Sequence, residues 1–338
     1  MADVVIVVGT KRGNEKVPAL EIKQMIGRAG RKHGGEACQA YIITDDDCEE
    51  LKSDIEQGSN LVVCSSFLTV DDLVFHLMPE ISSGRIRNTD DAERWFSRSL
   101  AATQGSRIDF RKLFDKMEKI GAVQKRPHGV VAPTRDGEIA AALYFHPADV
   151  RAWRENFARL FELGLEHDTA AIAWALGGLP VSHSQGDFGT HRFVLEEFRS
   201  ALPLGLDVLP GRMIRTVLWW GMMGGPPMGQ MRNQMLELRG DFGRVKRALL
   251  RMDQESGWGR SEFFDDVQVM VDRHVGCHLV ELCKLPGMSK GKAEYLYNRG
   301  VRTPDDIRDQ ITSIADEADE EFVGMLRRIV NDVPGKIG

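Results

Sequence analysis

The feature that most constrains the fold is a long stretch, residues 150–276, whose pattern is almost entirely helical. Apolar residues recur there at intervals of three and four, as they do on the buried side of an amphipathic helix. Trp153, Phe157, Leu160 and Phe161 begin this pattern. Strand-like runs elsewhere are few and short. The sequence therefore predicts a mixed but mainly α protein.

The beginning of the chain carries the strongest strand signals. Val4–Val8 is a continuous run of branched apolar residues, which is typical of a parallel strand buried on both faces. Tyr41–Thr44 is a second such run, and a helical segment separates the two. Strand, helix and strand in this order predict a small α/β layer. The layer is too small to form a complete domain of that class.

Residues 85–149 show a different order of elements. Helical patterns over Asp90–Ala101 and Phe110–Ile120 precede two short extended pieces, Ala122–Lys125 and Val130–Pro133. Helices followed by a small β-hairpin predict a winged helix. In a transcription factor the third helix of such a unit reads the major groove of DNA.

A short segment near the start, Gln24–Arg31, carries charged residues at helical offsets. Gln24, Arg28 and Arg31 are four and three residues apart, so a helix places them on one face. Guanidinium groups bind phosphate oxygens through two parallel hydrogen bonds, and two of them on one face can hold a triphosphate. An ordinary solvated helix end has the same pattern, and spacing alone leaves both interpretations open.

This segment also resembles a known motif. Glu21–Arg31, the turn Gly34–Glu36 and the strand Ala37–Thr44 together resemble the last helicase motif of superfamily-two helicases, in particular the Ski-like branch of archaeal-type DNA repair helicases. The resemblance implies a partial second RecA-like motor domain that faces ATP held by the first. It also implies that the winged helix at residues 85–149 is mainly a structural hinge between the motor and the helical bundle. It implies that Gln24, Arg28 and Arg31 contact the nucleotide. Arg28 and Arg31 would be catalytic, with Arg31 as the arginine finger.

A phosphate-binding loop of the G-x-x-x-x-G-K-[ST] type does not occur in the sequence. Its two Gly-Lys pairs, at Gly291 and Gly335, are not followed by Ser or Thr. The acidic run Asp45–Asp47 follows the arginine motif and is interpreted as a solvated turn. We therefore expect no ATP hydrolysis by this chain alone. ATP and Mg are expected only when a first motor domain completes the site, either as a separate polypeptide or as the missing part of a truncated chain.

Residues 241–256 form an amphipathic helical pattern with a cationic side. Arg244, Arg247 and Arg251 lie at offsets of three and seven, and guanidinium groups so placed stack on bases or hold successive phosphates of a single strand. A solvated helix face is the alternative. The resemblance implies that this segment is the ratchet helix of a helical bundle, with Arg244 and Arg251 contacting the strand. Archaeal relatives often carry an aromatic residue at the place of Arg251.

Leu285–Leu296 resembles a helix-hairpin-helix, a motif whose backbone N–H groups bind a DNA phosphate at a helix N-terminus. Gly287 fits the first hairpin glycine, whereas Ser289 occupies the usual place of the second. Lys290 and Lys292 add positive charge to the predicted nucleic-acid contact. A purely structural hairpin is equally compatible with these residues.

The predicted organisation has four parts. They are a partial RecA-like domain (1–84), a winged helix (85–149), a helical ratchet bundle (150–276), and a helix-hairpin-helix with closing helices (277–338). The predicted partners are single-stranded or branched DNA, or RNA, and a first RecA-like motor domain. Two other functions fit the same residues: a nucleic-acid-binding module without enzymatic activity, and a winged-helix regulator.

The net charge and the cysteine content limit the kinds of partner and the cellular compartment that we expect for this chain. The net charge is -6, but residues 85–126 carry eleven Lys and Arg against six Asp and Glu, so a basic surface fits within an acidic total. Five cysteines, odd in number and sparse, are typical of reduced thiols and predict a cytoplasmic protein. No apolar run reaches the length of a membrane span.

No metal site is predicted, because His274, Cys277, His278 and Cys283 fall in one presumed helix and its end.

Overall fold

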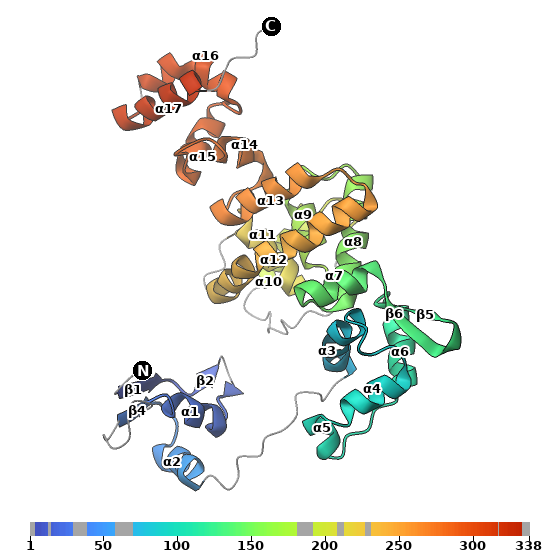
Figure 1. Ribbon diagram of the computed structural model, residues 1–338. Coiled ribbons are helices and arrows are strands. Elements are labelled where there is room, and N and C mark those ends of the chain that lie inside the picture. The colour runs from blue at the N-terminus through green and yellow to red at the C-terminus, as the bar shows by residue number, and fades with distance from the viewer. Residues whose placement is uncertain are drawn as a thin grey trace. The chain divides into compact units, whose positions relative to one another are not determined.

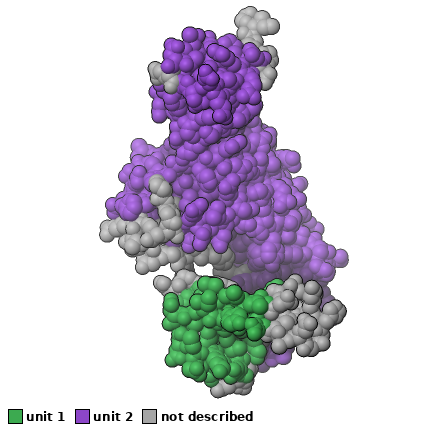
Figure 2. All heavy atoms as spheres, turned by 90° about the vertical axis from the view of Figure 1, so that its left-hand side faces the viewer, with its two compact units in different colours: residues 1–66 green, residues 67–338 purple. Residues whose placement is uncertain are grey.

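The structure is a computed structural model of the chain. It describes residues 4–12, 15–29, 39–57, 70–180, 192–207, 213–226, 231–316 and 318–332. The chain forms two compact units, residues 1–66 and residues 67–338, which are coloured separately in Figure 2 and described separately below. Helices dominate the described residues, so the prediction of a mainly α protein is confirmed.

The first unit contains a parallel strand pair joined through a helix (Figure 1). Strand β1 (Val4–Val8) pairs in parallel with β4 (Gln39–Ile43), and helix α1 (Ala19–Ile26) packs against β1. The predicted order of strand, helix and strand is confirmed. The described part of this unit also contains a short antiparallel pair and a helix: β2 (Lys11–Arg12), β3 (Glu15–Lys16) and α2 (Cys48–Gln57).

The expectation that β1 is buried on both faces was wrong. Val7 is 8% exposed, whereas Val4, Ile6 and Val8 are 47%, 59% and 76% exposed. Side chains alternate between the two faces of a strand, and α1 covers only one of them. On β4, Ile43 is also exposed. The sheet therefore presents an uncovered apolar face.

The second unit begins with helices and a β-hairpin around one apolar core. The elements are α3 (Val70–Ser82), α4 (Thr89–Phe96), α5 (Leu100–Thr103), α6 (Phe110–Lys119), β5 (Val123–Arg126) and β6 (Val130–Pro133). β5 and β6 pair antiparallel across the 3-10 turn Pro127–Gly129, which confirms the two predicted extended pieces. The single helix expected over Asp90–Ala101 is interrupted, because the Ser99 side chain accepts the N–H of Ala102 and starts α5.

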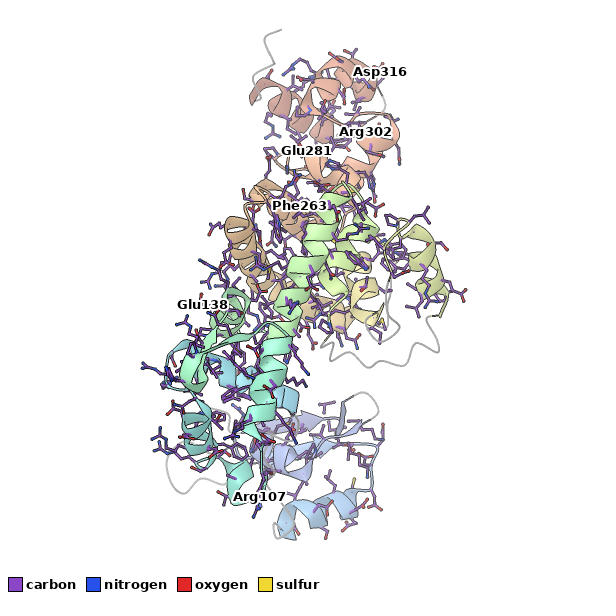
Figure 3. The ribbon with its side chains drawn as sticks, turned by 90° about the vertical axis from the view of Figure 1, so that its right-hand side faces the viewer. Arg107, Glu138, Phe263, Glu281, Arg302 and Asp316 are labelled. Carbon is purple, nitrogen blue, oxygen red and sulfur yellow. The ribbon has the colours of Figure 1, made fainter. Side chains whose placement is uncertain are left out.

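Among the described residues, the helices from α7 to α13 pack around the next core, which extends from Ile139 to Val280. They are α7 (Arg135–Leu143), α8 (Pro147–Glu162), α9 (Thr169–Gly177), α10 (Arg192–Ala201), α11 (Met213–Met222), α12 (Arg232–Ser256) and α13 (Ser261–Arg273). Phe263, labelled in Figure 3, joins an edge-to-face cluster with Phe157 and Phe161. A Cβ atom at Gly177 would lie 2.4 Å from the Cα of Thr216, so α9 and α11 meet backbone to backbone.

One arginine ties three of these helices together. Arg154 on α8 lies 2.6 Å from a carboxylate oxygen of Asp136 on α7 and 2.8 Å from one of Glu255 on α12. It also donates to the Ser256 hydroxyl at 2.7 Å. Burial lowers the pKa of Arg154, but the hydrogen bonds and charges of Asp136 and Glu255 outweigh that effect and raise it. We call this group the Arg154 clasp.

Replacing Arg154 with methionine should lower the free energy of unfolding by about 1–3 kcal/mol, because Asp136, only 16% exposed, would lose this cationic partner. Glu255, 21% exposed, would keep only the longer 3.9 Å contact with Arg135. Urea unfolding followed by circular dichroism measures the change. Arg159→Met on the same helix is the matched control, since Arg159 is 45% exposed and pairs with Glu162 within one turn. Equal shifts in the two variants would contradict a structural role for the clasp.

The C-terminal helices form a further core of their own. They are a 3-10 turn (Cys277–Leu279), α14 (Val280–Cys283), α15 (Lys290–Asn298), α16 (Pro304–Ala315) and α17 (Glu320–Asp332). Arg302, labelled in Figure 3, lies with its guanidinium 3.3 Å from the ring centre of Tyr297. Within the described residues, none of the helices is long and apolar enough to span a membrane. The predicted boundaries at residues 84, 149 and 276 stay a prediction.

Candidate functional site

The predicted nucleotide-facing residues lie at the end of α1. The helix ends at Ile26 and is followed by a turn, in which the N–H of Arg28 donates to the carbonyl of Met25 at 3.2 Å. Gln24 in the last helical turn and Arg28 in the following turn are both exposed. Among the described residues, no carboxylate pairs with the Arg28 side chain. Arg31 lies outside the described residues.

The acidic turn that follows β4 has a structural role. Asp46 accepts a hydrogen bond from the Thr10 hydroxyl and lies 3.1 Å from the ammonium group of Lys11. The hydrogen bonds from Thr10 and Lys11 lower the pKa of Asp46 below its usual value. Its side chain is only 13% exposed, so the expectation that all of these acids are solvated was wrong for Asp46. Asp47 accepts the N–H of Glu49 at the start of α2.

Helix α12 carries the predicted strand-binding arginines. It is one continuous helix of 25 residues and begins well before the predicted segment 241–256. Arg247 and Arg251 lie one turn apart and are exposed. Neither has a hydrogen-bond or ion-pair partner among the residues that the structure describes. These two guanidinium groups are therefore accessible to a phosphate or a base.

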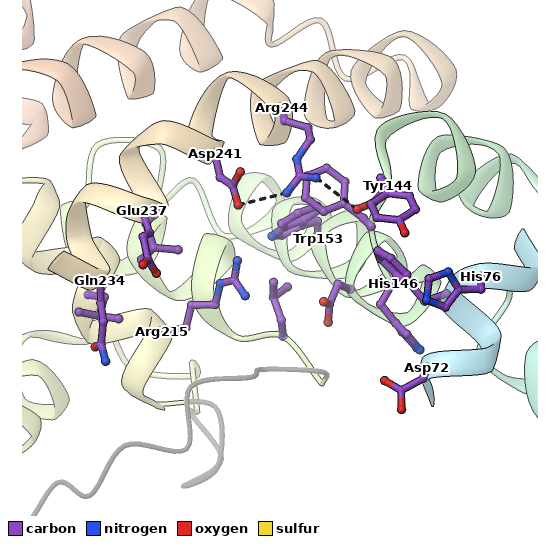
Figure 4. Close-up of a pocket in the computed structure, with 16 residues that line it drawn as sticks. Asp72, His76, Tyr144, His146, Trp153, Arg215, Gln234, Glu237, Asp241 and Arg244 are labelled. Atoms are coloured by element: carbon purple, nitrogen blue, oxygen red, sulfur yellow. Dashed lines mark hydrogen bonds and ion pairs between the residues drawn. The ribbon is translucent and has the colours of Figure 1, made fainter. Parts of the chain in front are cut away.

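Arg244 differs from the other two arginines, because it holds the junction between α7 and α8 (Figure 4). Its guanidinium lies 4.6 Å from the ring centre of Phe145, and it donates to the carbonyl of Tyr144 at 3.4 Å and to Asp241 at 3.1 Å. Tyr144 ends α7 in the left-handed conformation (φ 58°), which leaves its carbonyl for Arg244. The predicted stripe thus consists of one engaged and two unpaired arginines.

A cavity of about 720 Å³ lies beside Arg244 within the second unit (Figure 4). Side chains from α3, α8, α11 and α12 line it, together with Tyr144 and Phe145. Arg215 on α11 is one of these side chains, and sequence analysis did not identify it. The signal was present, because Arg215 is the one charged residue in the otherwise apolar helix Met213–Met222.

The predicted helix-hairpin-helix residues surround the turn between α14 and α15. Gly287 has a positive φ of 74°, and the Ser289 side chain caps α15 by accepting the N–H of Lys292 at 3.4 Å. Lys290 donates to the carbonyl of His274 at 3.0 Å. The ammonium group of Lys292 lies 5.3 Å from the ring centre of Phe322 on α17. The structure therefore brings Gly287 and Ser289 to an exposed turn and directs Lys292 against α17.

Comparison with known proteins shows a partial similarity to a DNA helicase. No protein-family model matches the chain. The chain is 30% identical over 146 residues to the ATP-dependent DNA helicase Hel308 of Pyrobaculum calidifontis, a match that covers 40% of this chain and 20% of the helicase. The chain thus spans about a fifth of the length of this relative. The similarity supports the relationship to superfamily-two helicases that the sequence motifs indicated.

Proposed function

We propose that this chain supplies nucleotide-facing arginines and strand-gripping helices to an ATP-dependent DNA helicase or translocase, in which a first motor domain holds ATP. The observation that carries the proposal is the 30% identity over 146 residues with an ATP-dependent DNA helicase. The proposed partners are single-stranded or branched DNA and that motor domain. RNA is the alternative strand.

The first unit supports a motor role. We assign its parallel strand pair to a second RecA-like domain, whose sheet normally has both faces covered. The exposed side chains of Val4, Ile6 and Val8 provide an apolar surface on which further elements of such a domain would pack. In this proposal the strands β1 and β4 are one part of a larger sheet.

The end of α1 fits a nucleotide phosphate. Arg28 is exposed and unpaired with any described carboxylate, so its guanidinium is available to an external anion. Gln24 adds an exposed amide on the preceding turn. Mg-ATP, when held by the first motor domain, supplies the phosphoryl group that is transferred to water. Arg28 and Arg31 would stabilise the negative charge that develops on it, with Arg31 as the arginine finger.

The second unit would hold the strand. We assign α4, α5, α6, the β5–β6 hairpin and α7 to a winged helix that acts as a hinge, and the helices from α8 to α13 to a ratchet bundle. The turn at Gly287 would be a helix-hairpin-helix. Arg247 and Arg251 are the primary strand contacts in this proposal, because they are exposed and unpaired among the described residues.

Replacing Arg247 and Arg251 together with alanine should weaken single-stranded DNA binding at least about tenfold. Two lost phosphate or base contacts should also reduce the slope of log affinity against log salt, by about 0.7 for each arginine that contacts a phosphate. Fluorescence anisotropy of a labelled oligonucleotide over a series of salt concentrations measures both quantities.

The control is the double variant Arg159→Ala/Arg199→Ala, which removes the same charge from exposed positions on α8 and α10. We expect it to retain nearly all of the affinity. Unchanged affinity in the α12 variant would contradict the ratchet assignment. Sequence-specific binding of duplex DNA that survives both variants would indicate a winged-helix regulator.

A further inference from the structure

The cavity beside α12 contains a guanidinium that has no hydrogen-bond or ion-pair partner among the described residues. Arg215 donates no hydrogen bond and forms no ion pair with any described residue, and its Nε atom is buried. Burial lowers the pKa of this side chain, against the raising effect of Asp149 and Asp241. Burying a hydrogen-bond donor of this kind raises the free energy of the folded protein unless an acceptor pairs with it. Among the described residues, no group accepts a hydrogen bond from the buried Nε–H of Arg215.

The charges around Arg215 restrict what that group is. Asp72, Asp149, Glu237 and Asp241 line the cavity, and these four carboxylates outnumber the guanidinium groups of Arg215 and Arg244. A phosphate would meet more negative than positive charge there. A neutral group with both acceptors and donors fits better, because the guanidinium groups donate to it and the carboxylates accept from it.

A nucleobase has this chemistry. Its edge carries acceptors that arginine recognises and amino or imino donors that carboxylates recognise. A volume of about 720 Å³ falls in the usual range of small-molecule sites and holds one base with room for water. The Tyr144 ring, 48% exposed and centred 4.1 Å from the ring of Phe75, provides an aromatic surface at the same cavity.

We propose that this cavity receives one unstacked base of the bound single strand, with Arg215 donating hydrogen bonds to acceptor atoms on the base edge. The inference rests on the proposed strand-binding function. Figure 4 shows the side chains of Arg215 and Arg244 reaching into the cavity from α11 and α12. Arg247 and Arg251 continue along α12 from Arg244, so the strand's phosphates have cationic contacts outside the acidic cavity.

The test compares two labelled oligonucleotides of equal length and charge, one with normal bases and one in which abasic sites replace them. The wild-type chain should prefer the oligonucleotide with bases. In Arg215→Met that preference should fall about tenfold, because a charged hydrogen bond to the base is lost. The matched control Arg199→Met removes an exposed arginine of α10 and should leave the preference unchanged.

A second measurement separates this loss from misfolding. Because Arg215 has no hydrogen-bond or ion-pair partner among the described residues, Arg215→Met should unfold at a temperature no lower than the wild type. If the wild type binds both oligonucleotides alike, the base cavity is wrong while strand binding stands. If neither oligonucleotide binds, the proposed function fails as well. Arg215-dependent binding of a free deoxynucleoside, together with equal binding of the two oligonucleotides, would also overturn the proposal.

Discussion

ATP hydrolysis should fall about a thousandfold or more when Arg28 and Arg31 are replaced by alanine and the chain is combined with a first motor domain. An arginine that reaches a transferring phosphoryl group contributes about 10³–10⁵ in rate, because it neutralises charge that exists only in the transition state. Arg28 is exposed and unpaired with any described carboxylate, so its removal leaves local structure intact. Phosphate release with saturating ATP and single-stranded DNA measures the effect.

The control for this experiment is Lys23→Ala. Lys23 is exposed on α1 and directly precedes Gln24, so it lies about 100° around the helix from that side chain. Its removal should change hydrolysis by less than about twofold. Two results would contradict the motor assignment: full hydrolysis by the arginine variant, or the absence of any stimulation when the unmodified chain meets a motor domain. The second result would favour a non-enzymatic binding module.

Trp153→Ala should lower the free energy of unfolding of the helical bundle by about 3–5 kcal/mol. Trp153 is 1% exposed, and its ring lies edge-on to Phe145 at 4.9 Å between centres. Its indole N–H donates to the carbonyl of Leu176 at 3.0 Å. The substitution thus creates a cavity and leaves a buried carbonyl without its donor, a loss that is large against the 5–15 kcal/mol typical of a domain.

Trp153→Phe separates these two contributions. Trp153→Phe keeps most of the aromatic volume and removes the hydrogen bond. It should therefore lower the free energy of unfolding by only about 1–3 kcal/mol. Near-ultraviolet circular dichroism during urea unfolding reports on this core directly. A Trp153→Ala variant that unfolds at the wild-type urea concentration would show that the α8–α9 packing described here is incorrect.

Sequence patterns predicted the elements that depend on local spacing. Phe110, Leu113, Phe114 and Met117 recur at helical intervals, and all four are buried on α6. The parallel pairing of Val4–Val8 with the strand after α1 was also predicted, and the register confirms it. Local sequence patterns predict such elements because a residue's offset from its neighbours along the chain sets the face of the helix or strand on which its side chain lies.

Features that depend on distant residues were not predictable in this way. The spacing of Arg244 with Arg247 and Arg251 indicates three equivalent side chains. The partners of Arg244, however, include the carbonyl of Tyr144, one hundred residues away. Arg154 likewise meets Glu255 across 101 residues. Only the packing of α7, α8 and α12 brings these groups together, so periodicity within one segment cannot distinguish the engaged arginine from the accessible ones.

The continuity of α12 has a mechanical consequence. With 25 residues the helix is about 37 Å long, and it joins the cavity near Arg244 to the clasp at Glu255 and Ser256 without an internal proline. The same helix therefore contacts α7 at two places, through Arg244 at the Tyr144 carbonyl and through Glu255 in the Arg154 clasp with Asp136. One continuous element thus lines the cavity and holds both ends of α7.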